Sequence, residues 1–230
     1  MKGIFAIIPA REKSKGVPLK NLRKLKGDPL IVWSIKAALI ANVFEKIFVS
    51  TESKRIANVA SRFNVEICNR PEELSKDDTP SEDVVAHVIR TKGLKDVKGI
   101  ALIQCTTPLV SPLTIRSAIL RFINSKGICS VVTVCKDYGY IGKKDGQYFI
   151  PFRKKRERRQ NMEPYLKETG ALYISKPEVW LKGNRFDKKI KYILMPKQDS
   201  FEIDDFWDLI IVEALLNAKD IYNSRDRNKS

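Results

Sequence analysis

The sequence predicts an α/β protein with three layers, in which helices cover both faces of a mostly parallel sheet. Short apolar runs that suit buried strands alternate along the chain with longer segments of helical pattern, and this alternation is typical of parallel sheets. With 230 residues, 43% of them hydrophobic, the chain is long enough to bury a sizeable core. We therefore expect one domain over residues 1–230.

The first half of the chain supplies most of the expected elements. The first strand is the run Ile4-Phe5-Ala6-Ile7-Ile8, and Asp28-Pro29 is expected to cap and open the helix that follows. Acidic residues come directly after Ser81 and favour a helix N-terminus there, while Pro112 opens another helix. The other expected elements are strands at 46–50, 65–68, 99–104 and 130–134 and helices at 29–42 and 54–62.

The alternation stops between about Lys136 and Lys167, where Gly, Tyr, Pro and charged residues dominate. We expect an insertion at about 136–168. Its apolar and aromatic residues fit a subunit interface, and a hairpin folded back on the protein's own core is the alternative. After the insertion the sequence predicts strands at 171–174 and 191–195 and a helix over 205–219.

The composition narrows the class of protein. No apolar run approaches the roughly 20 residues that span a bilayer, and the one after Lys2 is too short for a secretory signal. We therefore expect a cytoplasmic protein with no membrane partner. The four cysteines form no CxxC pair and lie at or near apolar runs, which favours reduced core thiols over a zinc site. His87 is expected at the margin of the core rather than as a catalytic base.

The formal net charge of +16 raises the question of nucleic-acid binding. The densest basic run, residues 153–159, is brief, and no recognition helix, zinc finger or RNP-type motif accompanies it. We therefore expect no nucleic-acid partner. The run is either a solvated loop or part of a basic surface that attracts anionic ligands.

A basic loop follows the first strand. Pro9-Ala10-Arg11 leads into Ser14-Lys15-Gly16-Val17-Pro18-Leu19-Lys20-Asn21, at the carboxyl end of the strand, where open α/β sheets bind their ligands. Arg11 can hold phosphate oxygens with its planar guanidinium, Lys20 adds a compact charge, and Gly16 lets backbone N–H groups come close. A solvated turn is the alternative. The spacing is neither that of a dinucleotide-binding glycine motif nor that of a Walker loop.

The string Ile-Pro-Ala-Arg-x-x-Ser-Lys-Gly-x-Pro-x-Lys-Asn over residues 8–21 resembles the nucleotide-binding signature of the CMP-sialic acid synthetases, or N-acylneuraminate cytidylyltransferases, among the sugar nucleotidyltransferases. The resemblance implies a Rossmann-like sheet of the nucleotide-diphospho-sugar transferase type and a site for CTP. The nucleotide-binding residues that it implies are Ala10, Arg11, Ser14, Gly16, Lys20, Asn21, Ser50 and Arg70.

Later motifs continue the resemblance at the ends of other strands. Val49-Ser50-Thr51 and Arg70-Pro71-x-x-Leu74 match two family elements. Gln104-Cys105-Thr106-Thr107-Pro108-Leu109 is similar to the family's Gln-x-Thr-Ser-Pro-Leu. Each motif has a second interpretation, since the serine can cap the next helix, the arginine can form a surface ion pair, and the glutamine amide can pair with backbone groups.

Sugar-binding candidates come from the insertion and the strand after it. Arg158-Arg159-Gln160 matches the family's Arg-Gln step, and Thr169-Gly170-Ala171-Leu172-Tyr173-Ile174 is similar to its Asn-Gly-Ala-x-Tyr-Ile. Some relatives carry Arg where this chain has Lys167, which leaves the identity of the sugar acid open. The resemblance also implies a homodimer formed through the insertion. The sugar-binding residues that it implies are Gln104, Arg159, Gln160, Lys167 and Tyr173.

The segment Phe201-Glu202-Ile203-Asp204-Asp205 carries the expected metal ligands. Side chains two apart in an extended segment face the same side, so Glu202 and Asp204 can converge on one Mg²⁺, which prefers hard oxygen ligands. Asp205 then points away or caps the next helix. The family's motif is commonly Asp-Ile-Asp, so Glu202 is longer by one methylene. The alternative is that the whole acidic group only caps the helix.

Together these motifs predict a Mg²⁺-dependent cytidylyltransferase that joins CTP to a nonulosonic acid and releases pyrophosphate. The expected catalytic residues are Arg11, Lys20 and Asp204, and no general base is assigned. A cytidylyltransferase for KDO is the close alternative, although that branch usually has Arg-Leu-Pro where this chain has Lys15-Gly16-Val17-Pro18. A basic nucleic-acid-binding protein is the alternative from another class.

Overall fold

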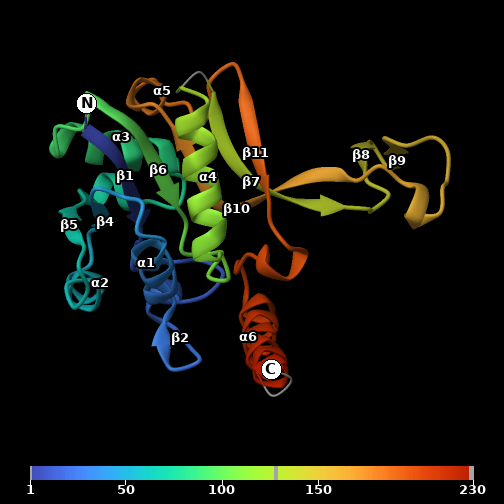
Figure 1. The fold of residues 1–230 in the computed structure, drawn as a ribbon, viewed down its shortest axis with the longest axis horizontal. Coiled ribbons are helices and arrows are strands. Elements are labelled where there is room, and N and C mark those ends of the chain that lie inside the picture. The colour runs from blue at the N-terminus through green and yellow to red at the C-terminus, as the bar shows by residue number, and fades with distance from the viewer. Residues whose placement is uncertain (1, 127–128, 228–230) are drawn as a thin grey trace.

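The computed structural model describes residues 2–126 and 129–227. Its central sheet has seven strands in the order β11 (Ile190–Leu194), β7 (Ser130–Asp137), β10 (Tyr165–Ser175), β6 (Val97–Ile103), β1 (Lys2–Pro9), β4 (Ile47–Thr51) and β5 (Glu66–Asn69) (Figure 1). Strand β10 runs antiparallel to both of its neighbours, and the other pairs in this sheet are parallel. The predicted α/β fold with a mostly parallel sheet is confirmed.

Helices cover both faces of this sheet (Figure 1). The apolar side chains of α1 (Leu30–Ala41), α2 (Lys54–Ala60) and α4 (Pro112–Asn124) form the core on one face. Those of α3 (Ser81–Thr91) and α5 (Pro177–Leu181) form the core on the other face. The last helix, α6 (Phe206–Arg227), contributes to a third cluster that joins it to the basic loop.

Strand β1 shows why its sequence forms the centre of the sheet. Ile4, Ala6 and Ile8 pack into the core of α1, α2 and α4, whereas Phe5 and Ile7 pack into the core of α3 and α5. All five side chains are at most 4% exposed. A strand that is buried on both faces needs a continuous apolar run, so the five apolar residues specify a central position.

Most expected elements are present with small shifts at their ends. The helix predicted from residue 29 begins at Leu30, so Pro29 takes the N-cap position expected for Asp28, and no side chain caps the helix. These two residues also form β3 (Asp28–Pro29), paired with β2 (Lys24–Leu25), and the Asp28 carboxylate binds Lys36 at 2.6 Å. At α4, Pro112 occupies the first turn as predicted, and the Ser111 hydroxyl caps the helix.

The insertion predicted at about 136–168 projects from the sheet as an arm (Figure 1). Paired residues of β7 and β10 form its base, and the hairpin of β8 (Gly142–Asp145) and β9 (Tyr148–Pro151) forms its tip. Every residue of β9 is exposed. The alternative of a hairpin folded back on the core is therefore wrong.

The lone histidine and the cysteines take the places expected of them. Cys68, Cys105, Cys129 and Cys135 are free and buried, and burial raises the pKa of the Cys105 thiol to about 12. His87 lies half-buried on α3. Within the described ranges, no helix combines the length and apolarity that crossing a membrane requires.

Candidate active site

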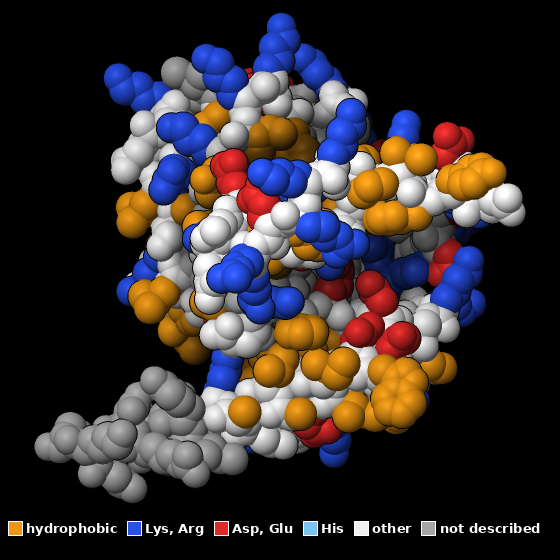
Figure 2. Space-filling view, turned by 90° about the vertical axis from the view of Figure 1, so that its right-hand side faces the viewer, with side chains coloured by type: hydrophobic (Ala, Val, Ile, Leu, Met, Phe, Trp, Pro, Cys, Tyr) orange, Lys and Arg blue, Asp and Glu red, His pale blue; other side chains and the backbone are white. Residues whose placement is uncertain are grey.

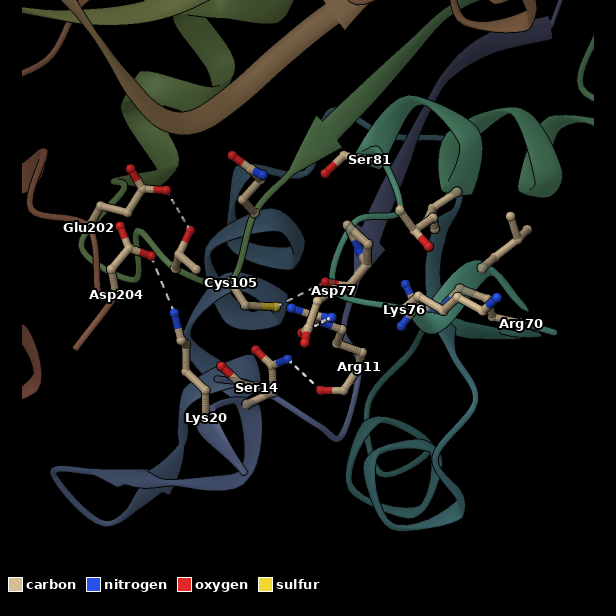
Figure 3. Close-up of a pocket in the computed structure, with 17 residues that line it drawn as sticks. Arg11, Ser14, Lys20, Arg70, Lys76, Asp77, Ser81, Cys105, Glu202 and Asp204 are labelled. Atoms are coloured by element: carbon tan, nitrogen blue, oxygen red, sulfur yellow. Dashed lines mark hydrogen bonds and ion pairs between the residues drawn. The ribbon is translucent and has the colours of Figure 1, made fainter. Parts of the chain in front are cut away.

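A cavity of about 330 Å³ opens at the carboxyl ends of β1 and β6, the edge where parallel sheets present ligand sites. Figure 3 shows that its wall comes from four parts of the chain: the basic loop, the segment that leads into α3, the end of β6 and the segment before α6. The lining residues are Pro9, Arg11, Ser14, Lys20, Asn21, Arg70, Leu74, Lys76, Asp77, Thr79, Ser81, Val84, Gln104, Cys105, Thr106, Glu202 and Asp204.

One acidic residue pairs with two cations of the basic loop at this cavity. The Asp77 carboxylate binds the Arg11 guanidinium at 2.6 Å and the Lys15 ammonium at 3.3 Å. Desolvation opposes its ionisation, but Lys15 and Arg11 hold the pKa of Asp77 below its ordinary value. A bound polyphosphate can therefore take over cations whose present partner is an exposed carboxylate.

The basic loop is joined to the carboxylate segment through Lys20. Its side chain is only 11% exposed, and its ammonium donates to the Ile203 carbonyl at 2.6 Å and reaches Asp204 Oδ1 at 3.3 Å. Gly16 contributes to the same junction, because a Cβ there would lie 1.9 Å from the Asp204 carbonyl oxygen. The two predicted halves of the site are thus in direct contact.

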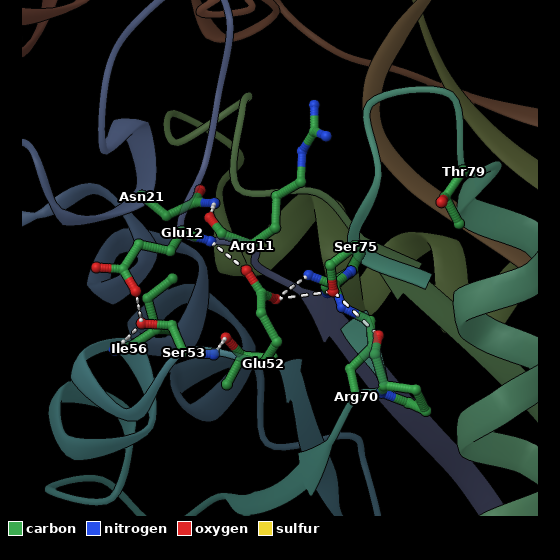
Figure 4. Close-up of polar contacts among 12 residues, drawn as sticks. Arg11, Glu12, Asn21, Glu52, Ser53, Ile56, Arg70, Ser75 and Thr79 are labelled. Carbon is green, nitrogen blue, oxygen red and sulfur yellow. Dashed lines mark hydrogen bonds and ion pairs between the residues drawn. The ribbon is translucent and has the colours of Figure 1, made fainter. Parts of the chain in front are cut away.

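Arg70 is held at the cavity by Glu52, a residue that the sequence analysis did not single out. The Arg70 guanidinium donates to Glu52 Oε2 at 2.8 Å, and the Ser75 hydroxyl donates to the same oxygen at 3.1 Å. The Glu12 N–H donates to Glu52 Oε1 at 2.7 Å (Figure 4). Burial raises the pKa of Glu52, but Arg70 and the backbone N–H groups lower it below its ordinary value overall.

This arrangement predicts a large loss of stability when Glu52 is removed. The Arg70 and Glu52 side chains are 4% and 17% exposed, so Glu52→Ala leaves a buried guanidinium unpaired and should lower the free energy of unfolding by about 3 kcal/mol. Glu66→Ala is the matched control, because Glu66 pairs with Lys46 at a side chain that is 43% exposed, and should cost no more than about 1 kcal/mol. Urea unfolding measures both, and equal losses would contradict the role of Glu52.

The two predicted metal ligands lie at the opposite wall from Arg70 (Figure 3). Glu202 Oε1 accepts a hydrogen bond from the Thr106 hydroxyl at 3.1 Å. Burial, and then the nearby Asp204, raise the pKa of Glu202. Because each of two close carboxylates disfavours the ionisation of the other, a cation between them would relieve the repulsion.

The cap of α6 comes from other acids. Asp205 Oδ1 accepts from the N–H groups of Trp207 and Asp208 at 2.7 and 3.0 Å, which confirms the prediction that Asp205 caps the helix. Asp208 Oδ2 in turn accepts from the N–H groups of Asp204 and Asp205. The Asp204 carboxylate, 74% exposed, and the Glu202 carboxylate are therefore left for another task, and the alternative in which all three only cap the helix is wrong.

The oxygens at this wall fit a magnesium ion. Among the side chains that the structure describes, no group of three or more His, Cys, Asp and Glu could hold a metal by itself. Mg²⁺ does not need one, since it is usually bound by one or two carboxylates together with substrate phosphates and water. Glu202 and Asp204 both line the cavity beside the basic loop, and their carboxylate oxygens are of the hard type that Mg²⁺ takes.

Some nucleotide-binding candidates lie off the cavity wall. Ser50 is fully buried in β4, and its hydroxyl has no hydrogen-bond partner among the described residues. Ala10, also buried, donates its N–H to the Ser50 carbonyl at 2.9 Å. The helix cap after β4 is provided by Ser53, whose hydroxyl accepts from the Ile56 N–H. Ser50 and Ala10 therefore support the floor of the site rather than line it.

The sugar-binding candidates are spread over separate places. Gln104 lines the main cavity, and Lys167 lines a neighbouring hollow of about 410 Å³ that shares Glu202 and Asp204 with it. Arg159 lines a third hollow at the base of the arm, with its guanidinium 5.2 Å from the Tyr138 ring. The hydroxyl of buried Tyr173 donates to Glu168, and Gln160 is exposed. Within a single chain, these candidates therefore do not lie together at one site.

Several polar lining residues were given no binding or catalytic role by the sequence analysis. Among them are Lys76, Asp77, Thr79, Ser81 and Thr106. Thr106 lies in the same motif as Gln104, and Ser81 is the first residue of α3. Both positions could have been recognised from the sequence as candidates for the site. Lys76 and Thr79 lie in an irregular segment whose path the sequence pattern does not specify.

Comparison with known proteins places these features in a family. The family model for cytidylyltransferases matches residues 5–226. N-acylneuraminate cytidylyltransferase A of Danio rerio is 35% identical over an alignment of 208 residues that covers 87% of this chain and 48% of the relative. The enzyme of the same name from Streptococcus agalactiae serotype III is 32% identical over an alignment of 217 residues that covers 90% of this chain and 52% of the relative. The chain spans about half the length of these curated relatives.

Solved structures share the fold at low sequence identity. A CMP:2-keto-3-deoxy-manno-octonic acid synthetase, solved as a complex with CTP, superposes with a TM-score of 0.70 at 14% identity and covers 95% of this chain and 100% of its own. A 4-diphosphocytidyl-2C-methyl-D-erythritol synthase from Anaerococcus prevotii gives a TM-score of 0.63 at 14% identity, with 94% and 96% coverage. With the family model matching nearly the whole sequence, the chain belongs to the cytidylyltransferase family.

Proposed function

We propose that this chain transfers CMP from CTP to a nonulosonic acid of the sialic type and releases pyrophosphate. The observation that carries the proposal is the junction in one cavity between Arg11 and Lys20 on one side and Glu202 and Asp204 on the other. Cations that can hold a triphosphate and carboxylates that can hold Mg²⁺ meet there. The relatives named N-acylneuraminate cytidylyltransferase support the choice of substrates.

In the proposed reaction the anomeric hydroxyl of the sugar attacks the α-phosphorus of CTP and releases its proton to water, while the bond from that phosphorus to the pyrophosphate oxygen breaks and pyrophosphate leaves. Arg11 and Lys20 hold the triphosphate and stabilise the charge that develops on it. Gln104 and Lys167 orient the sugar acid from the two adjoining hollows. Glu202 and Asp204 would hold Mg²⁺, which neutralises charge on the triphosphate. Positioning supplies much of the remaining rate enhancement.

We further propose that two chains associate through the arm. Exposed apolar side chains gather at its tip, where Tyr148, Phe149 and Phe152 are 67%, 61% and 58% exposed. The start of α6 presents Phe206 and Trp207 at 56% and 72%. Figure 2 shows these two apolar regions on one face of the molecule, with acidic side chains between them. Arg159, which lies away from Gln104 in one chain, would then act at the sugar site of a second copy.

The dimer leads to a test by sedimentation velocity at micromolar concentration, where we expect twice the chain mass of 26.3 kDa. Phe149→Asp places a charge on the exposed tip and should shift the protein to the monomer. Leu113→Asp is the control, because Leu113 is 71% exposed on α4 and outside the proposed interface, so it should leave the dimer intact. A stable and active wild-type monomer would contradict the proposal.

We also propose that the protein works in the cytoplasm. The four cysteines are free and buried, which suits a reducing compartment.

The substrate is tested by a pyrophosphate-release screen that pairs CTP with individual sugar acids. We expect release with a nine-carbon acid such as N-acetylneuraminic, legionaminic or pseudaminic acid, and weaker release with the eight-carbon KDO. Salt-sensitive RNA binding without any CTP-dependent release would instead support the nucleic-acid alternative.

A further inference from the structure

Strand β10, which lies between β7 and β6, carries a bulge in its pairing with β7. Glu168 pairs with Val134, and Tyr173 pairs with Val132, so the four residues 169–172 of β10 lie opposite the single residue Thr133 of β7. The extra residues include Gly170. Bulges are common beside active sites, where they redirect the chain and its side chains.

Buried threonines hold this bulge in one conformation. The Thr169 hydroxyl donates to Thr133 Oγ1 at 2.8 Å, and the Leu172 N–H donates to the same oxygen at 3.1 Å. The Thr107 hydroxyl donates to the Thr169 carbonyl at 2.9 Å. All three threonines are at most 2% exposed. Buried hydrogen bonds of this kind are costly to break, so Gly170 has a fixed place.

That place is directly against the Glu202 carboxylate. Gly170 has φ +66°, and a Cβ added to it would lie 2.7 Å from Glu202 Oε1 and 2.9 Å from Cδ. The same oxygen, Glu202 Oε1, accepts the Thr106 hydroxyl at 3.1 Å, and the neighbouring Ile203 N–H donates to the Thr106 carbonyl at 2.7 Å. The carboxylate is therefore confined between the end of β6 and the bulge of β10.

We propose that Gly170 is a positioning residue whose missing side chain leaves the space in which Glu202 presents its carboxylate beside Asp204. This inference rests on the proposed function, because that function assigns Glu202 to the metal site. A methyl group at position 170 displaces a longer acid but clears a shorter one. Aspartate at position 202 ends one methylene earlier, so it should tolerate alanine at position 170.

The experiment compares wild type with Gly170→Ala, Glu202→Asp and the double variant. Binding of Mn²⁺ in the presence of CTP is measured by electron paramagnetic resonance, and the Mg²⁺ concentration for half-maximal CMP transfer is measured alongside it. Gly93→Ala is the control for backbone strain, since Gly93 has φ +64° and no atom within 4 Å of an added Cβ. Gly93 has the same left-handed backbone conformation as Gly170 but no side chain close to it.

We expect Gly170→Ala to weaken Mn²⁺ binding and raise the Mg²⁺ requirement on the order of tenfold or more, while Gly93→Ala leaves both unchanged. In the Gly170→Ala background, Glu202→Asp should restore most of the loss. If Gly170→Ala fails to fold, the double variant should fold and bind Mn²⁺, because the same clash is removed.

The role of Gly170 is overturned by equal Mn²⁺ affinity in wild type and Gly170→Ala. It is overturned equally by a double variant that is no better than Gly170→Ala, in metal binding or in folding. A wild-type chain that binds Mn²⁺ but transfers no CMP contradicts the proposed function. The role of Gly170 is then still tested by comparing the Mn²⁺ affinities of the variants.

Discussion

Replacing Asp204 by Asn is expected to nearly abolish CMP transfer while leaving the protein folded. The substitution preserves volume but removes one charge and one hard ligand from the pair with Glu202. It also removes the acidic partner of Lys20, which lies 3.3 Å from Asp204 Oδ1. Because the Asp204 side chain is 74% exposed, little stability depends on it.

The adjacent acid gives a matched control. Asp205→Asn removes the same charge one residue away, and asparagine keeps the cap that Asp205 provides to α6. We therefore expect near-normal turnover and near-normal stability for Asp205→Asn. Rate measured against Mg²⁺ concentration separates the two variants, and an unchanged metal dependence in Asp204→Asn would rule out its place in the metal site.

Variants of Glu202 refine this prediction. Glu202→Asp restores the shorter acid of the family motif and should retain substantial activity. Glu202→Gln keeps the length but loses the charge, and should raise the Mg²⁺ requirement.

Arg11→Ala and Lys20→Ala are expected to lower turnover on the order of 10²-fold or more, since each removes a charge-assisted contact that strengthens in the transition state. For Lys20 part of the loss comes through the ground state, because its ammonium also donates to the Ile203 carbonyl. Lys24→Ala is the control, an exposed lysine a few residues along the same segment. The initial rate at saturating CTP measures the effect, with circular dichroism to confirm the fold.

Near-normal rates in either variant would remove that residue from the triphosphate site. A reduced rate in Lys24→Ala of the same size would indicate that net charge, rather than the position of the cation, is what matters.

Much of the fold could be predicted because local pattern and tertiary environment agree in it. The continuous apolar run of β1 needs cover on both faces, and it has that cover. The antiparallel direction of β10 could not be predicted, because the pattern of apolar residues along a strand does not indicate which strand it pairs with or in which direction. The cap was expected at Asp28 but lies at Pro29, because the pairing of β2 with β3 that positions these residues depends on a turn between the two strands.

The site was predictable where its residues lie in compact motifs, either after a strand, as Arg11 and Gln104 do, or directly before a helix, as Asp204 does. Glu52 was not, because its partners Glu12, Arg70 and Ser75 come from separate segments that meet only in the fold. The spacing of residues along the sequence does not indicate which separate segments come into contact in the fold. Arg159 was placed in the insertion from the sequence, and the structure adds that in one chain it lines a different hollow from Gln104.

The central claim is tested most directly by following the α-phosphate of CTP. Purified protein is incubated with Mg²⁺, N-acetylneuraminic acid and CTP labelled with ³²P at the α or the γ position. The account predicts that the α label appears in a CMP-sugar and the γ label in pyrophosphate, in equal amounts, and that both products vanish in Asp204→Asn. Pyrophosphate without a labelled sugar, or no label transfer with any nine-carbon acid, would contradict it.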